Sequence, residues 1–281
     1  MSAAKPPLPE WVRLLLLSPA EAVKWMQDRG LLAPTFSWQD LWQDEHSRMF
    51  TVAKMMRLDL LQVVYDAVSD AVEKGAPLRD FSKALTPILQ EAGWWGKQTV
   101  VDPLTGEEVV AQLGSPKRLE LIYDVNLRQS YAAGRFQRAQ RSRAAVPFLL
   151  YRTMRDERVR ATHRPWDNIA LPVDHAWWDT HYPPNGWRCR CRARPATQSD
   201  LDELRDGGME IKTEAPPIEY VEFTNRRTGA VERVPRGIDP GFAFNPGKVA
   251  ASEKALDAAY QQKLAGIAEA LRQAQERLDR G

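Results

Sequence analysis

The chain has 281 residues, of which 43% are hydrophobic and 27% are charged, and its net charge at pH 7 is +2. These values are typical of a folded globular protein, and they exclude a fibrous chain, a wholly disordered chain and a strongly basic histone-like protein. The basic residues comprise 28 arginines and 11 lysines, so any attraction to nucleic acid is expected to come from local arginine clusters.

Residues 1–45 form a predicted N-terminal arm with one short helix. Ser18 and Glu21 provide the two halves of a capping box, which predicts a helix over residues 19–29 that ends at Gly30. The apolar run at residues 14–17 is far shorter than a bilayer span and has proline-rich flanks. We therefore expect no signal peptide and no membrane segment, and we place the protein in the cytoplasm.

Residues 46–146 form a predicted helical region with an inserted hairpin. Apolar residues recur at helical spacing in three segments, which predicts helices over residues 44–74, 78–92 and 116–143. Two valine-rich runs within residues 99–112 flank a turn at residues 102–106, which predicts the hairpin.

Residues 147–248 form a predicted core with little regular structure. A short strand is expected at residues 148–151, a second hairpin at residues 220–234, and a linker rich in proline and glycine at residues 235–246. The predicted fold class is α+β, with a helical N-terminal layer, a small irregular core that contains β-structure and a Cys-x-Cys strand, and a C-terminal helix.

Residues 249–281 are predicted to form this C-terminal helix. Its apolar residues step by four and three positions, as in a heptad seam, at Tyr260, Leu264, Ile267, Leu271, Ala274 and Leu278. Such a helix either docks on its own body or binds a partner, and the sequence leaves both alternatives open.

Both cysteines and three of the four histidines fall between residues 163 and 191. Cys189 and Cys191 flank one residue, so an extended chain directs both sulfurs to the same side, where they could bind one zinc ion. Two isolated cysteines do not indicate a secreted disulfide scaffold. The alternative is that both cysteines are reduced and pack as small apolar residues beside hydrogen-bonded histidines.

Arginines crowd the same region. Arg188, Arg190, Arg192 and Arg194 alternate along the predicted Cys-x-Cys strand, which would make one sheet face cationic. Such a face could bind DNA phosphates or acidic partner surfaces without reading bases. A solvated face with internal salt bridges is the alternative.

The region resembles the signature of the phage Mu F-like head morphogenesis family. The matching residues are Asp156-Glu157-Arg158-Val159-Arg160 with His163, then Trp178, then Pro183-Pro184-Asn185-Gly186-Trp187-Arg188-Cys189-Arg190-Cys191-Arg192. Flanking segments within residues 122–135 and 239–247 also resemble the family. The resemblance extends from about residue 18 to residue 248, and it implies a structural role in the motif for Asp156, Arg160, Pro183, Pro184, Gly186 and Trp187.

The resemblance implies a minor capsid protein of a tailed phage or prophage, and not an enzyme. Such a protein acts in procapsid assembly at or near the portal and in DNA packaging or ejection. The implied partners are the portal protein, the major capsid or scaffolding protein, and phage DNA through backbone contacts, with no membrane. The implied location is the host cytoplasm during assembly and then the virion head.

The resemblance also bears on zinc, because another branch of the family has a fuller set of cysteine and histidine ligands. Here Gly186 stands where that branch has a further histidine, which leaves His163, Cys189 and Cys191. We choose His181 as the fourth ligand because it is near the Pro183-Pro184 turn; His175, Asp174 and water are the alternatives.

A metal-dependent hydrolase or nuclease is the competing function. It would use an open metal site built from His163, Asp167, Asp174, His175 and His181. No catalytic Ser-His-Asp order, phosphate-binding loop or His-Glu-x-x-His helix supports a specific reaction.

Overall fold

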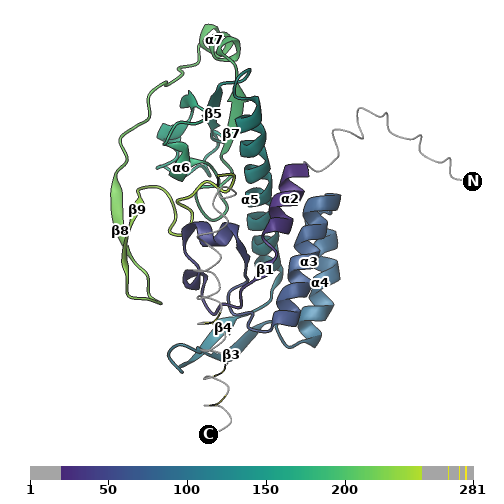
Figure 1. The fold of residues 1–281 in the computed structure, drawn as a ribbon. Coiled ribbons are helices and arrows are strands. Elements are labelled where there is room, and N and C mark those ends of the chain that lie inside the picture. Colours follow the sequence, from purple (N-terminus) through teal and green to yellow (C-terminus); the bar gives the residue numbers. More distant parts are fainter. Residues whose placement is uncertain (1–19, 249–264, 266–271, 273–275, 277–281) are drawn as a thin grey trace, which may run out of the picture.

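The computed structural model describes residues 20–248 and the single positions 265, 272 and 276. The predicted helix over residues 249–281 and the predicted cap at Ser18 therefore lie outside the described residues. The described part has the predicted α+β fold, in which a layer of helices lies beside small two- and three-stranded sheets (Figure 1).

Four helices form the helical layer: α2 (Ala20–Asp28), α3 (Leu58–Lys74), α4 (Leu78–Glu91) and α5 (Pro116–Ser142). Local signals set their ends. The Ser115 hydroxyl accepts a hydrogen bond from the backbone N–H of Arg118 and caps α5. Gly75 ends α3 with a φ of 65°, which glycine adopts without strain. The predictions for α2, α4 and α5 are confirmed to within a few residues.

The predicted helix over residues 44–74 is wrong in its first part. After η1 (Trp38–Asp40), the chain forms the short 3-10 helix η2 (Gln43–Ser47), and β2 (Met49–Phe50) then pairs in parallel with β1 (Leu31–Leu32). Met49 and Phe50 are both fully buried, in two different clusters. An extended pair buries side chains on both of its faces, whereas an amphipathic helix buries only one stripe.

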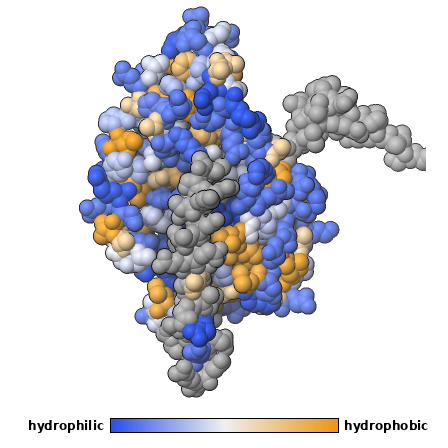
Figure 2. All heavy atoms as spheres, in the orientation of Figure 1, coloured by the Kyte–Doolittle hydropathy of each residue, from blue (hydrophilic) through white to orange (hydrophobic). Residues whose placement is uncertain are grey.

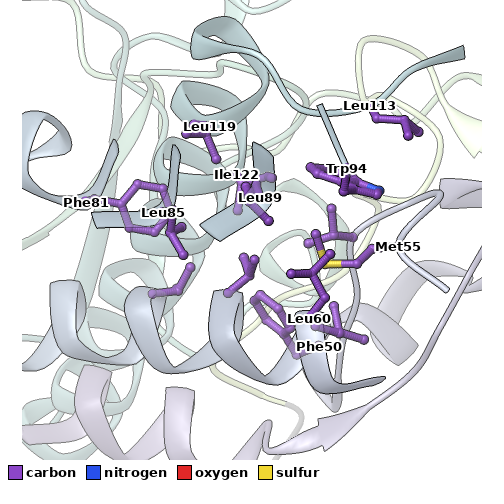
Figure 3. Packing of buried hydrophobic residues seen from close by; sticks show 14 of the residues in the cluster. Phe50, Met55, Leu60, Phe81, Leu85, Leu89, Trp94, Leu113, Leu119 and Ile122 are labelled. Carbon is purple, nitrogen blue, oxygen red and sulfur yellow. The ribbon is translucent and has the colours of Figure 1, made fainter. Parts of the chain in front are cut away.

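The first hydrophobic core lies between α3, α4 and the N-terminal half of α5, with contributions from α2 and β2 (Figure 3). Leu61, Val64, Leu85 and Leu89 are almost completely buried in it. Each such side chain contributes roughly 1.5–3 kcal/mol through removal from water. The predicted hairpin is confirmed as β3 (Lys97–Val101) and β4 (Glu108–Gln112), and it packs on this core through Ala111.

A second core surrounds a three-stranded antiparallel sheet in the order β6-β5-β7. Its strands are β5 (Phe148–Arg152), β6 (Ala170–Pro172) and β7 (Arg192–Ala196). The short helices η3 (Arg164–Trp166) and α6 (Trp178–His181) supply tryptophans that pack on the sheet. Helix α7 (Gln198–Asp206), which was not predicted, follows β7 and begins with a capping box of Thr197 and Asp200.

Helix α5 connects the two cores. Leu119 and Ile122 belong to the first core, whereas Ala132 and Phe136 belong to the second. Gly134 allows α2 to cross α5 closely, because a β-carbon at this position would lie 2.8 Å from the backbone nitrogen of Ala22.

The second predicted hairpin is confirmed as β8 (Tyr220–Thr224) and β9 (Val231–Pro235), which extends along the side of the molecule (Figure 1). Arg227 in its turn donates to the carboxylates of Asp40, at 2.6 Å, and Asp102, at 2.5 Å. All three side chains are largely buried. The hairpin turn is therefore fastened both to η1 and to the β3–β4 hairpin.

The face shown in Figure 2 is mostly hydrophilic, with small separate hydrophobic patches. Among the described residues, no helix has the length and apolarity required to cross a membrane.

Candidate functional site

His163, Cys189 and Cys191 converge in the second core. His163 comes directly before η3, and the two cysteines lie in the segment that leads into β7. The Nδ1 atom of His163 lies 3.8 Å from the Sγ of Cys189 and 3.6 Å from the Sγ of Cys191. One potential ligand atom from each residue lies within 4.8 Å of the other two, and all three residues are buried. The predicted association of these three residues is present.

The orientation of His163 suits metal binding. Its Nε2 atom lies 2.8 Å from the carbonyl oxygen of Gly237, and its ring stacks on Trp166 at 4.8 Å. A proton on Nε2 donates to that carbonyl and leaves the lone pair of Nδ1 directed at the two sulfurs. Metal-binding histidines in proteins are commonly held by such a second hydrogen bond.

The two thiols perturb each other. The hydrogen bond from Cys191 holds the pKa of Cys189 well below its usual range, and His163 lowers that pKa further. The same contact with Cys189, together with burial, raises the pKa of Cys191. Cys189 is therefore the more acidic of the two thiols. Thiolates and a neutral imidazole are the ligands that zinc prefers, so the donor set fits this ion.

His181, the predicted fourth ligand, is not part of this group of three residues. Its ring stacks on Trp177 at 4.6 Å, and its Nδ1 atom lies 2.8 Å from the hydroxyl of Thr180. Burial lowers the pKa of His181 to about 4. Its nearness in sequence to the proline turn did not place it near the sulfurs, because α6 directs the ring into the tryptophan cluster.

The other predicted alternatives also lie elsewhere. His175 accepts a hydrogen bond from the backbone N–H of Trp177, and Asp174 is exposed. Asp167 pairs with Arg155 at 2.8 Å. Within the described residues, the five side chains of the proposed hydrolase or nuclease do not form a shared metal-ligand group.

Three signature residues, Arg160, Gly186 and Trp187, form a clamp centred on Asp239. Both terminal nitrogens of Arg160 donate to the Asp239 carboxylate, at 2.8 and 2.9 Å, and one of them also donates to the carbonyl of Trp187 at 2.9 Å. The backbone N–H of Trp187 donates to the same carboxylate at 2.8 Å. Gly186 makes room for this pair, because a β-carbon there would lie within 3.0 Å of both charged groups.

The proline turn is held by hydrogen bonds of Asn185 to β5 and to the backbone of Asp239. Pro183 and Pro184, joined by a cis peptide bond, are buried. The buried side chain of Asn185, which follows them, accepts a hydrogen bond from the hydroxyl of Tyr151 on β5 at 2.8 Å. The backbone N–H of Asp239 donates to the carbonyl of Asn185 at 3.0 Å. These bonds position the segment that carries the two cysteines.

The four alternating arginines do not all lie on one strand, which corrects the prediction. Only Arg192 and Arg194 belong to β7, where they are exposed. Arg190 forms a two-point ion pair with Asp156 at 2.7 Å, and Arg188 lies 3.7 Å from Glu120. Two of the four positive charges are thus already paired within the chain.

Sequence analysis missed Asp239 and Gly237 as residues that hold the site. Asp239 begins the flanking segment that resembles the family, and this was the available signal. Gly237 contributes only a backbone carbonyl, for which residue type gives no indication.

Comparisons with known proteins agree with the signature. The sequence profile described as "Phage Mu protein F like protein" matches residues 62–194. Over 247 residues the chain is 36% identical to the "Putative capsid assembly protein F" of Escherichia phage Mu. The alignment covers 83% of this chain and 55% of that protein. It is 35% identical over 184 residues to the Mu-like prophage FluMu F protein of Haemophilus influenzae, covering 63% of this chain and 43% of that protein.

The chain thus spans about half the length of these two relatives. No solved structure gives a significant match. The profile match includes α5, most of the three-stranded sheet, both cysteines and the clamp residues Arg160, Gly186 and Trp187, whereas Asp239 lies outside it. Residues 62–194 therefore carry the domain of the phage Mu protein F like family, and the similarity to two proteins named F extends beyond this domain.

Proposed function

We propose that this chain is a structural component of a tailed-phage head that acts in capsid assembly. The observation that carries the proposal is its 36% identity to the Mu protein named for capsid assembly. The geometry supports a structural role, because Asp239, Asp156 and Asp167 are each paired with an arginine. None of these carboxylates is left as a free general base.

The finer proposal is that the chain acts at or near the portal, in procapsid assembly and in DNA packaging or ejection. Asymmetric reconstruction of procapsids with this chain labelled tests it. Density for the label at the portal vertex is the expected result. Label distributed evenly over the shell would refute the portal location, and absence of the chain from procapsids would refute the assembly role.

We also propose that His163, Cys189 and Cys191 bind one structural zinc ion. The burial of all three residues and the hydrogen bond between His163 and Gly237 support this proposal. Bound zinc would cross-link the loop before η3 to the segment before β7 through these three ligands. Elemental analysis of protein purified without a histidine tag should give one zinc per chain. A zinc content near zero, with melting unchanged by a chelator, would refute the proposal.

A hydrolase or nuclease would need an accessible reactive centre, and the described residues supply no observation that favours one. The purified protein is therefore expected to cleave neither DNA nor peptides. Turnover that disappears on replacement of Asp174 or His181 would contradict the structural assignment.

A further inference from the structure

A pocket lies between α5 and the proline turn. Its volume is about 210 Å³, enough for several water molecules at roughly 30 Å³ each. Tyr131 and Arg135 of α5 line it together with Pro183, Pro184 and Arg192. Cys189 and Cys191 also border the pocket. Its wall therefore combines aromatic and proline surface with positive charge.

The positive charge of this pocket is only partly balanced. Three arginines and one carboxylate line it, and that carboxylate, Asp124, is already paired with Arg128 at 2.6 Å. Arg135 and Arg192 have no carboxylate partner within the described part of the chain. The Arg135 side chain contacts the hydroxyl of Tyr182, but its Nε atom is buried without a hydrogen-bond partner.

The electrostatics of Arg135 favour the arrival of an anion. Burial lowers the pKa of Arg135, and the nearby charge of Arg192 lowers it further. An anion between the two guanidinium groups would offset both effects. The neighbouring signature arginines differ, because Arg160 and Arg190 are neutralised by Asp239 and Asp156.

We propose that this pocket binds a glutamate or aspartate side chain from an acidic segment of another head protein. This inference rests on the proposed role in head assembly. A protein carboxylate is favoured over a DNA phosphate because Arg135 is recessed between tyrosine and proline side chains. Contacts to the DNA backbone use cations on an open surface, whereas a pocket with apolar walls accepts a side chain together with its apolar neighbours.

The test uses the full chain and the Nε–Hε signals of its arginines in nitrogen-15 NMR spectra. The probe is N-acetyl-glutamyl-leucinamide, and N-acetyl-glutaminyl-leucinamide is its uncharged control. Arg135→Lys identifies the Arg135 signal by removing it. We expect the glutamyl probe to displace this signal in a saturable manner, and the glutaminyl probe to leave it unchanged.

Arg192→Gln tests the second guanidinium without disturbing the buried part of α5, because Arg192 is exposed. Loss of one charge-assisted contact should lower the affinity for the glutamyl probe by about tenfold or more. Arg194→Gln is the matched control, since it lies on the same strand and removes the same charge but does not line the pocket. The Arg194→Gln variant should bind the glutamyl probe with the same affinity as the unmodified chain.

Three results would overturn the proposal: no displacement of the Arg135 signal, equal displacement by both probes, or equal weakening by the two variants. A short DNA duplex that displaces the Arg135 signal more tightly than the glutamyl probe would assign the pocket to nucleic acid instead. These outcomes are distinct from failure of the head-assembly role, which would appear as absence of the chain from procapsids whatever the probe does.

Discussion

Replacing Asp239 by asparagine tests whether the signature residues stabilise the fold. Asp239 accepts three hydrogen bonds, two from Arg160 and one from the backbone of Trp187, at 2.8 to 2.9 Å. Asparagine keeps the shape of the side chain but replaces one acceptor oxygen with a donor. At least one of the three donors then loses its partner and faces another donor.

The size of the effect follows from the burial of this pair. Hydrogen bonds to charged groups are worth about 1.5–3 kcal/mol each. The Asp239 side chain is 29% exposed, so water compensates part of the loss and the result stays at or below the roughly 3–5 kcal/mol of a fully buried broken pair. We expect Asp239→Asn to lower the free energy of unfolding by roughly 2–3 kcal/mol, or the melting temperature by roughly 5–10 °C.

Urea and thermal unfolding at fixed zinc concentration measure this difference. Asp156→Asn is the matched control, because Asp156 also makes a two-point pair with an arginine but lies at the surface. Its effect should be smaller, because the Asp156 side chain is 40% exposed and ion pairs contribute less as their exposure increases. Equal destabilisation by the two variants would refute the reasoning. It would also be refuted if the losses in free energy of unfolding caused by Arg160→Gln and by Asp239→Asn simply added in the double variant, because residues that interact directly give non-additive losses.

Three other predictions concern pH, helix packing and the thiols. Burial lowers the pKa of His181 from 6.5 to about 4, so its contribution to stability is complete above pH 6.5 and is lost as the pH falls toward 4. The loss amounts to roughly 3 kcal/mol of unfolding free energy. In His181→Phe the free energy of unfolding, measured with urea, should depend less on pH over this range; the same pH dependence in both proteins would contradict the assignment. Gly134→Val should lower the melting temperature, because its β-carbon would lie 2.8 Å from the Ala22 nitrogen and overpacking costs about 1–3 kcal/mol, whereas Gly207→Ala, with its nearest neighbour at 3.4 Å, should melt almost unchanged. Replacing Cys189 and Cys191 by serine should abolish zinc binding and increase protease cleavage near Arg164; equal zinc content in the variant would exclude the two sulfurs as ligands.

Local signals in the sequence were sufficient for most helices and both hairpins. Ser115 and Gly75 act through their immediate neighbours, so sequence alone locates the ends that they set. The capping box of Thr197 and Asp200 was equally visible, yet α7 was not predicted. The false helix over residues 44–57 shows the limit of periodicity. Burial of both Met49 and Phe50 depends on β1 and on two separate clusters, which are tertiary features.

The candidate site was predictable where neighbouring residues define it and not where distant ones do. Cys189 and Cys191 are two positions apart, so the sequence alone predicted that their sulfurs lie close together. Asp239 lies 79 residues from Arg160, and Gly237 lies 74 residues from His163. No local rule pairs residues at such separations. The choice of His181 failed for the same reason, because α6 and the tryptophans of the second core determine where its ring lies.

The excess of arginine over lysine has a structural explanation at several positions. Arg160 bridges Asp239 and the Trp187 carbonyl, Arg155 bridges Asp167 and Asn168, and Arg227 bridges Asp40 and Asp102. In each case one planar guanidinium satisfies two acceptors at fixed angles, which the single ammonium of lysine cannot reproduce. Segments with little regular structure are thereby held in place. Because these arginines are paired within the chain, a count of basic residues overstates the charge available to partners. Arginines without an acidic partner in the described part of the chain, such as Arg135 and Arg192, are the better guide to where a partner binds.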